Sequence, residues 1–149
     1  MASRSLPPDE ALRLDNQLCF ALYSASLAMT KLYKPLLDEL GLTYPQYLVM
    51  LVLWEGDGLM VSELGQRLRL DSGTLTPLLK RLEGAGFVSR MRAVEDERRV
   101  HIHLTAAGRR LKARAARVPG CMLAASRCSV PELLRLTEQI RTLREQLAA

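Results

Sequence analysis

Between positions 62 and 105, apolar residues first follow the spacing of two short helices. The first carries Leu64 and Leu68 four residues apart, which places both side chains on one helix face. The second begins at Asp71 and Ser72, two residue types that favour a helix N-cap. Its expected core positions, and the glycines expected to end it, are Leu75, Leu78, Leu79, Leu82, Gly84 and Gly86. The pattern predicts two helices joined by a tight turn.

Two short runs of strand-forming residues follow these helices. Residues 86–92 (GFVSRMR) and 98–105 (RRVHIHLT) are typical of β-strands, and the charged turn 93–97 joins them. A helix-turn-helix followed by such a ribbon is a winged helix-turn-helix, which we place at about residues 60–105. This module is typical of proteins that bind double-stranded DNA.

Long apolar stripes flank this module on both sides. On the N-terminal side, apolar residues recur at helical spacing at Leu14, Leu18, Leu22, Ala25, Met29, Leu32 and Leu36. On the C-terminal side, Ser129 and Glu132 form a capping-box pattern. A repeat of three and four residues follows it, at Leu133, Leu136, Ile140, Leu143 and Leu147.

These stripes allow two interpretations. Either both close one intramolecular core, or residues of about 9–42 and 108–149 form dimerisation helices that pack against a second copy of the chain. DNA binding favours the second, because two recognition helices of a dimer must meet successive major grooves, ~34 Å apart. We therefore expect a homodimer.

Composition favours one helical domain over the whole chain, residues 1–149. Hydrophobic residues make up 48% and aromatic residues only 5%, which predicts a mainly α protein with a small β-ribbon. The N-terminus has no apolar segment typical of a signal peptide. The longest apolar run, residues 47–54, is far short of the ~20 residues that span a membrane. We expect a cytoplasmic protein with no membrane contact.

Positive charge is concentrated on the predicted DNA-binding module and the segment after it. Residues 62–117 contain thirteen Lys or Arg and six Asp or Glu, a balance of +7, whereas the whole chain has +5. Local basicity of this kind is typical of a phosphate-binding surface, although many charged faces only contact solvent.

Three cysteines are the candidate chemical groups: Cys19, Cys121 and Cys128. They form no CxxC pair and no zinc-like spacing, and they are expected to be free thiols in a cytoplasmic protein. His101 and His103 alternate on one predicted strand without a third ligand, so we expect exposed strand residues rather than a metal site. We expect no cofactor. Cys19, beside the N-terminal stripe, is either an inert small apolar residue or a reactive thiol.

A second capping-box pattern bears on Cys19. Residues 43–46 (TYPQ) place Tyr44 in the first turn of a helix, and helix N-termini favour a nearby thiolate. The phenols of Tyr33 and Tyr44 can also donate hydrogen bonds to sulfur. The sequence alone does not bring these groups together.

The segments SELGQRL, LDSGTLTPLLKRLEGAGFVSR, the D-x-R at Asp96 and Arg98, and LTAAG at residues 104–108 resemble the multiple antibiotic resistance regulator (MarR) family. The resemblance extends over nearly the whole chain. It implies a homodimeric transcriptional regulator that binds a pseudo-palindromic operator in double-stranded DNA.

Residues 19–55 are similar to the organic hydroperoxide resistance regulators, a peroxide-sensing branch of that family. The resemblance implies that Cys19 is the redox sensor and that Tyr33 and Tyr44 hydrogen-bond it across the dimer interface. In two-cysteine members, a C-terminal cysteine of the other subunit then closes a disulfide with the oxidised sensor. Cys121 and Cys128 are both candidates for this resolving role, and we favour Cys121.

The expected function is therefore a repressor that senses organic hydroperoxides and releases its operator when Cys19 is oxidised. By resemblance, the gene that it controls encodes a thiol peroxidase. Two alternatives remain: a thiol peroxidase that turns over peroxide at Cys19, and a repressor controlled by a small aromatic ligand. We expect a regulator and not an enzyme.

DNA contacts are expected from the second helix and from the tip of the ribbon. On the helix, the candidate residues are Ser72, Thr74, Thr76, Pro77, Lys80 and Arg81. At the tip, Arg98 is expected to enter the minor groove while Asp96 holds its guanidinium. The alternative for these two residues is a surface ion pair of little energetic value.

Overall fold

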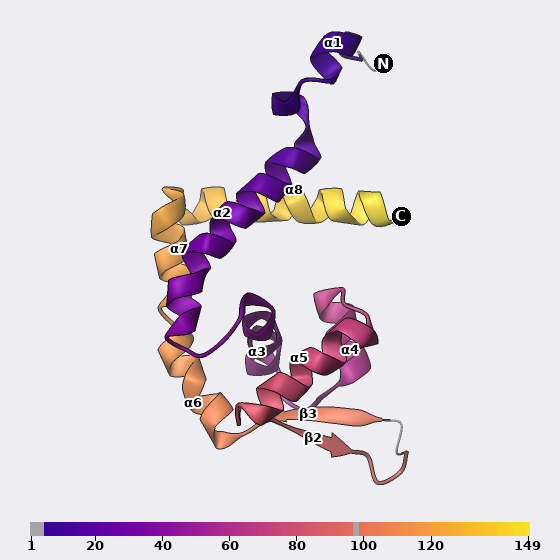
Figure 1. Ribbon diagram of the computed structural model, residues 1–149, viewed down its shortest axis with the longest axis vertical. Helices are drawn as coiled ribbons and strands as arrows, with labels where there is room; N and C mark the ends of the chain where they lie inside the picture. Colours follow the sequence, from indigo (N-terminus) through magenta and orange to yellow (C-terminus); the bar gives the residue numbers. More distant parts are fainter. Residues whose placement is uncertain (1–4, 97–98) are drawn as a thin grey trace.

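The computed structural model describes residues 5–96 and 99–149 and is mainly helical, with one small sheet (Figure 1). The N-terminal part contains α1 (Pro8–Ala11), the 3-10 turn η1 (Leu14–Asn16) and the long α2 (Leu18–Asp38). The middle part contains α3 (Tyr44–Glu55), β1 (Leu59–Met60), α4 (Val61–Leu68), α5 (Ser72–Gly84), β2 (Val88–Arg92) and β3 (Val100–Leu104). The chain ends with α6 (Ala106–Ala115), α7 (Val118–Ser126) and α8 (Val130–Ala148).

The predicted winged helix-turn-helix is confirmed. Helices α4 and α5 pack against each other, and β2 and β3 pair as an antiparallel ribbon. Asp71 caps α5, because its carboxylate accepts a hydrogen bond of 2.7 Å from the backbone N–H of Thr74. Gly86 follows the end of α5 with a positive φ of 84°, a conformation that favours glycine.

One strand was not predicted. The two residues of β1, Leu59 and Met60, pair with Ile102 and His101 of β3, which gives the sheet the order β1-β3-β2. A strand of two residues is too short to show an alternating pattern in the sequence. It anchors the start of α4 to the ribbon, so the first helix of the DNA-binding module is tied directly to the wing.

We call α3 to α6 together with the three strands the reading head. The leucines predicted to be buried in α5 are buried, and their neighbours include Leu64 and Ile102. Helix α6, at the start of the segment expected to dimerise, also belongs to this core, because Leu111 and Ala115 are buried in it. The backbone of Gly108 lies so close to Phe87 that a Cβ atom would come within 2.1 Å of the Phe87 carbonyl oxygen.

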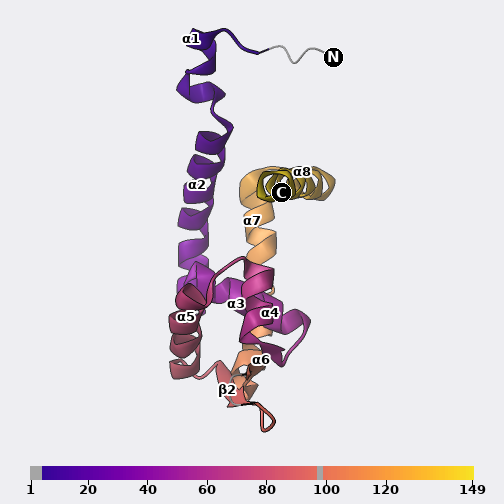
Figure 2. The same cartoon turned by 90° about the vertical axis from the view of Figure 1, so that its right-hand side faces the viewer.

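We call α2, α7 and α8 the outer helices. Figures 1 and 2 show α8 and the start of α2 on one side of the reading head and the ribbon on the opposite side. Within α2, which the structure describes completely, only Leu37 is buried, and none of the residues of α8 is buried. The interpretation in which both stripes close one intramolecular core is therefore wrong for the single chain.

Helix α2 begins later than the sequence predicted. The apolar stripe suggested a continuous helix from Leu14, but Gln17 has an extended backbone with φ −90° and ψ 112°, and α2 begins at Leu18. Leu14 instead lies in the separate turn η1. None of the helices within the described residues is long and apolar enough to cross a membrane.

Candidate functional site

Three tyrosines form a cluster where α2 meets α3. The predicted capping box is present, since Thr43 accepts from the backbone N–H of Gln46 and the Gln46 side chain accepts from that of Thr43. It fixes Tyr44 in the first turn of α3. The ring of Tyr33 lies 5.0 Å from that of Tyr44 and 6.0 Å from that of Tyr47, measured between centroids. Tyr47 was not predicted to belong to this site, although its spacing of three residues from Tyr44 places both on one helix face.

Burial controls the protonation of these phenols. Desolvation, with smaller contributions from Tyr44 and Tyr47, raises the pKa of Tyr33 to about 12. Burial also raises the pKa of Tyr44 and of Tyr47. All three hydroxyls are therefore protonated at neutral pH, so each can donate a hydrogen bond without adding negative charge.

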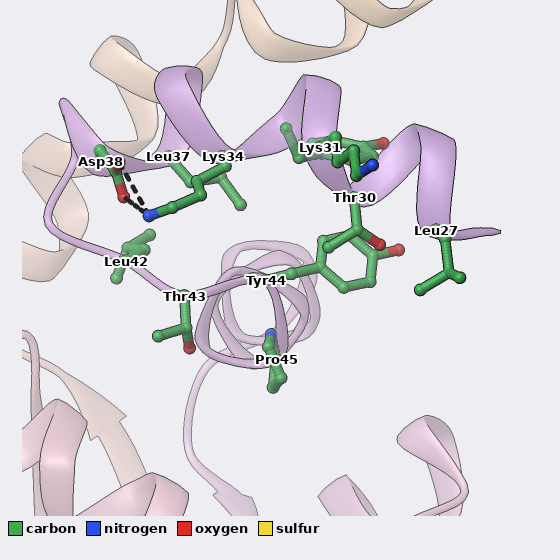
Figure 3. A pocket seen from close by; sticks show the side chains of 11 residues that line it. Leu27, Thr30, Lys31, Lys34, Leu37, Asp38, Leu42, Thr43, Tyr44 and Pro45 are labelled. Atoms are coloured by element: carbon green, nitrogen blue, oxygen red, sulfur yellow. Dashed lines mark hydrogen bonds and ion pairs between the residues drawn. The ribbon is translucent and has the colours of Figure 1, made fainter.

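A cavity of about 380 Å³ opens beside Tyr33 and Tyr44. Figure 3 shows the ring of Tyr44 reaching from α3 towards Thr30 on α2. Most of its walls are apolar, and they include Leu27, Leu37 and the ring of Pro45. Lys31 and Lys34 also line it, and Lys34 forms an ion pair of 3.2 Å with Asp38. The cavity can hold a small apolar molecule next to two phenol donors.

Cys19 lies far from this cluster in the single chain. It is the second residue of α2 and is exposed. Fourteen residues separate it from Tyr33, which corresponds to roughly 21 Å along the helix axis at 1.5 Å per residue. The structure of one chain therefore does not bring the expected sensor and its expected hydrogen-bond donors together.

The other two cysteines differ in their local structure. Cys121 is exposed and lies within α7, which packs against α2. The helix begins at Val118, before Cys121, so this cysteine is inside the helix rather than at its start. Cys128 is half-buried in the turn before α8, where its backbone N–H donates to Ser126 Oγ at 3.2 Å.

The expected DNA-contacting residues of α5 form one accessible surface. Five of them are exposed, namely Ser72, Thr74, Pro77, Lys80 and Arg81, and Thr76 is partly buried. At the tip of the ribbon, the Asp96 carboxylate lies 3.9 Å from Nε of Arg99. Arg98, and with it the predicted contact between Asp96 and Arg98, lies outside the described residues.

The two histidines of β3 are not the exposed residues that we expected. Both are partly buried, and the turn before β1 contacts them: a Cβ atom on Gly58 would lie 3.1 Å from the ring of His103. Nδ1 of His101 lies 3.2 Å from the carbonyl oxygen of Gly58. The expectation missed this contact because it depends on the unpredicted strand β1.

Comparison with known proteins assigns the family. A family model described as transcriptional regulator SarA/Rot matches residues 31–115. The organic hydroperoxide resistance transcriptional regulator of Bacillus subtilis (strain 168) is 52% identical over 136 residues, which are 91% of this chain and 92% of that protein. The chain belongs to the MarR family of transcriptional regulators, in its organic hydroperoxide resistance branch.

Solved structures of this regulator family have the same fold. The reduced form of AbfR bound to DNA, a protein of Staphylococcus epidermidis, is 35% identical and superposes with a TM-score of 0.79. The alignment covers 95% of this chain and 99% of that one. A disulfide-formed AbfR is 36% identical with a TM-score of 0.64, and the alignment covers 94% of this chain and 93% of that one. These relatives are transcriptional regulators, and this MarR-family chain is a regulator rather than an enzyme.

Proposed function

We propose that the chain forms a homodimeric repressor that senses organic hydroperoxides at Cys19 and releases its operator when Cys19 is oxidised. The observation that carries the proposal is the placement of Cys19 and Tyr33 on the same side of one exposed helix. Fourteen residues are close to four helical turns, so the two side chains lie along one line of α2. The Tyr33 end of this line holds the phenols, and the other end holds the thiol.

If the α2 helices of two subunits paired about a twofold axis, Cys19 of one helix would lie beside Tyr33 of the other. Ser26 lies seven residues from both Cys19 and Tyr33 and is the midpoint of the line. In an antiparallel pair centred on Ser26, position 19 of one helix faces position 33 of the other. The neighbouring Ala25 and Ser26 are small, which lets two helices approach closely. Tyr44 would accompany Tyr33, because their rings are 5.0 Å apart.

The exposed apolar residues support a dimer. Leu18, Leu32, Leu136 and Ile140 are each at least 40% exposed in the single chain. They belong to the two stripes expected to dimerise, and a contiguous apolar surface on two long helices favours burial against a second copy. Each dimer would contain two sensor sites, each with a thiol from one subunit and phenols from the other.

The chemistry at such a site has two steps. The Cys19 thiolate attacks one peroxide oxygen, the O–O bond breaks, an alcohol leaves after taking a proton, and sulfur becomes a sulfenic acid. A second thiolate then attacks this sulfur, the S–O bond breaks, an S–S bond forms, and the hydroxide leaves as water after taking a proton. We assign the second thiol to Cys121 of the other subunit, because it is exposed on a helix that packs against α2. The disulfide-formed state of the relative AbfR supports a mechanism of this kind.

Oxidation would change the spacing of the two reading heads. The outer helices carry Cys19 and Cys121, and the reading heads carry the exposed residues of α5 that are expected to contact DNA. A disulfide between subunits would shift the outer helices and, with them, the distance between the two α5 helices. Operator binding requires a fixed separation of about one DNA turn. Loss of that separation would release the operator and allow transcription of the controlled gene.

A non-reducing gel combined with an operator-release assay tests the proposal. Wild-type protein treated with an organic hydroperoxide should migrate at twice the monomer mass and leave the DNA. Cys19→Ser should bind the operator normally, form no crosslink and ignore the peroxide. Cys121→Ser should lose the crosslink, whereas Cys128→Ser is the matched control and should retain it. A crosslink that persists in Cys19→Ser would exclude Cys19 as the sensor.

A second candidate is control by a small aromatic ligand, which the cavity beside Tyr33 and Tyr44 favours. Its walls are largely apolar and two lysines lie at its edge, features that suit an aromatic carboxylate. Under this alternative, Cys19→Ser would still leave the operator when such a compound is added. Release of the wild-type protein by hydroperoxide alone, with no response to aromatic carboxylates, would exclude it.

A further inference from the structure

A basic cavity of about 230 Å³ lies in the reading head, between the two helices of the DNA-binding module and the ribbon. Five elements contribute to it. Met60 comes from β1, Ser62 from the first turn of α4, Thr76 from α5, Arg90 from β2 and Val100 from β3. Arg99, just before β3, also lines the cavity, and none of the described residues that line it is acidic. Two guanidinium groups and two hydroxyls therefore line the cavity, and no carboxylate of the described residues lines it.

The side chain of Arg90 has a hydrogen-bond donor that is available to an anion. Its Nε atom is buried and has no hydrogen-bond acceptor among the described residues. The nearby carboxylate of Glu83 accepts a hydrogen bond of 3.0 Å from the backbone N–H of Arg90, not from the guanidinium. A buried donor without an acceptor is unfavourable, and it is satisfied when an anion enters.

Arg99 adds a second positive charge that is only weakly engaged. Its ion pair with Asp96 has a separation of 3.9 Å, and its side chain is 64% exposed. An exposed pair of this length contributes little energy, so Arg99 can turn towards an anion in the cavity at small cost.

The position of the cavity identifies the anion. In a winged helix-turn-helix complex, the recognition helix enters the major groove and the wing reaches the adjacent minor groove. One sugar–phosphate backbone separates these two grooves, so it must pass between α5 and the ribbon. The cavity has Thr76 of α5 on one side and Arg90 of β2 on another. It therefore lies between the two elements that such a backbone would pass.

We propose that this cavity seats one DNA backbone phosphate in each subunit and that Arg90 is its principal ligand. The proposal rests on the DNA binding proposed above and adds a residue that the sequence analysis did not select. Arg90 was missed because it lies in the predicted ribbon, away from both α5 and the charged tip. A phosphate contact carries no base information, so it should strengthen binding to every duplex by the same factor.

The salt dependence of DNA binding by the full-length dimer tests the proposal. Each phosphate contact contributes a slope of about −0.9 to a plot of log K against log salt concentration, so Arg90→Gln should reduce the slope by about two for two subunits. Affinity for the operator and for an unrelated duplex should fall alike, by about tenfold or more. Arg90→Lys, which keeps the charge, should retain the slope. Arg141→Gln is the matched control, since it removes one exposed charge on α8, and should also retain it.

Three outcomes would overturn the proposal. The first is an Arg90→Gln protein, shown to be folded by circular dichroism, whose slope is unchanged. The second is a loss of affinity confined to the operator, which would make Arg90 a reader of bases or DNA shape. The third is saturable, Arg90-dependent binding of inorganic phosphate by the DNA-free protein together with an unchanged slope, which would assign the cavity to a free anion. Absence of any duplex binding by wild-type protein would overturn the proposed function as well, whereas binding with an unchanged slope rejects only the role of Arg90.

Discussion

The leucines of the reading head and those of α8 differ in exposure to solvent. In the reading head, Leu64 and Leu82 are completely buried. On α8, Leu134 is 63% and Leu147 is 76% exposed, and α8 buries none of its residues. Burial of a leucine side chain is worth about 1.5–3 kcal/mol, so leaving such residues in water wastes a large favourable term. The reading head thus has a closed hydrophobic core, whereas most apolar side chains of the outer helices remain exposed.

The functional groups divide in the same way. The exposed residues of α5 that are expected to contact DNA, and Arg90 with its unsatisfied Nε, belong to the reading head, whereas Cys19 and Cys121 belong to the outer helices. The two halves meet where the C-terminal part of α2 packs on α3: Leu37 is buried in the core, and Tyr33 contacts Tyr44 and Tyr47. A polar contact joins them as well, since Arg114 of α6 donates to the carbonyl oxygen of Glu39, just after α2, at 2.7 Å. In the proposed function, the second subunit and the oxidant act on the outer helices, while the reading head keeps its own core.

The largest expected effect is a loss of stability in the reading head. Leu79 is 1% exposed, and Leu79→Ala should lower the free energy of unfolding by about 2–5 kcal/mol because it leaves a cavity in the core. Urea unfolding followed by circular dichroism measures this change. The matched control is Leu136→Ala on α8, where the side chain is 49% exposed. At concentrations where the protein is monomeric, the control should change the free energy by less than about 1 kcal/mol. Equal losses in the two variants would show that the two halves do not differ.

The same contrast explains what the sequence could predict. The leucines of α5 and the caps at Asp71 and Thr43 are local signals, and the structure has them where the spacing placed them. Strand β1 has two residues and no local signal, and the late start of α2 depends on the backbone at Gln17. A contact between Cys19 and the tyrosines is not a local feature. Cys19 and Tyr33 lie roughly 21 Å apart along α2 in one chain, so such a contact requires a second subunit and has no signal in the spacing.

The next largest effect should appear in the outer helices. Ile140 is 40% exposed in the single chain and belongs to the stripe of α8. If this stripe packs against a second copy, Ile140→Asp buries an unpaired charge in each subunit and should weaken the dimer by about 3 kcal/mol, on the order of a hundredfold. Sedimentation equilibrium measures the dissociation constant. Thr142→Asp introduces the same charge at an exposed position off the stripe and should leave the dimer intact. A fully dimeric Ile140→Asp protein would place the interface elsewhere.

A smaller effect is expected at the tyrosine cluster. Tyr33→Phe removes one hydroxyl and keeps the ring, so it should slow alkylation of Cys19 at neutral pH by about three- to tenfold, which corresponds to roughly 1 kcal/mol for one hydrogen bond. Stopped-flow alkylation of the dimer measures the rate. Tyr23→Phe, at an exposed position on the same helix, is the control and should react like wild type. Identical rates in all three proteins would exclude a contact between Tyr33 and Cys19.

The raised pKa of Tyr33 also predicts a pH dependence of stability. Between pH 10 and about 12, the tyrosine ionises in the unfolded chain while the folded chain keeps its proton. The unfolded state then binds fewer protons, so wild-type stability should fall as the pH rises through this window. Tyr33→Phe has no ionisable group there and should lose less stability on going from pH 9 to pH 12. Urea unfolding at fixed pH values measures both curves, and parallel curves would contradict the prediction.

The smallest effect concerns the ion pair that joins the two halves directly. Nη2 of Arg69, at the end of α4, lies 2.5 Å from the carboxylate of Glu145 on α8. Both side chains are largely exposed, so water and salt weaken their attraction, and a coupling free energy of only about 0.2–1 kcal/mol is expected. A double-mutant cycle with Arg69→Gln and Glu145→Gln measures the coupling, and Gln preserves most of each side chain. The coupling should decrease further as salt is raised, because screening acts on exposed charges. A coupling free energy above 2 kcal/mol that salt does not change would mean that α8 is held firmly to the reading head. The outer helices could then not move independently of the reading head.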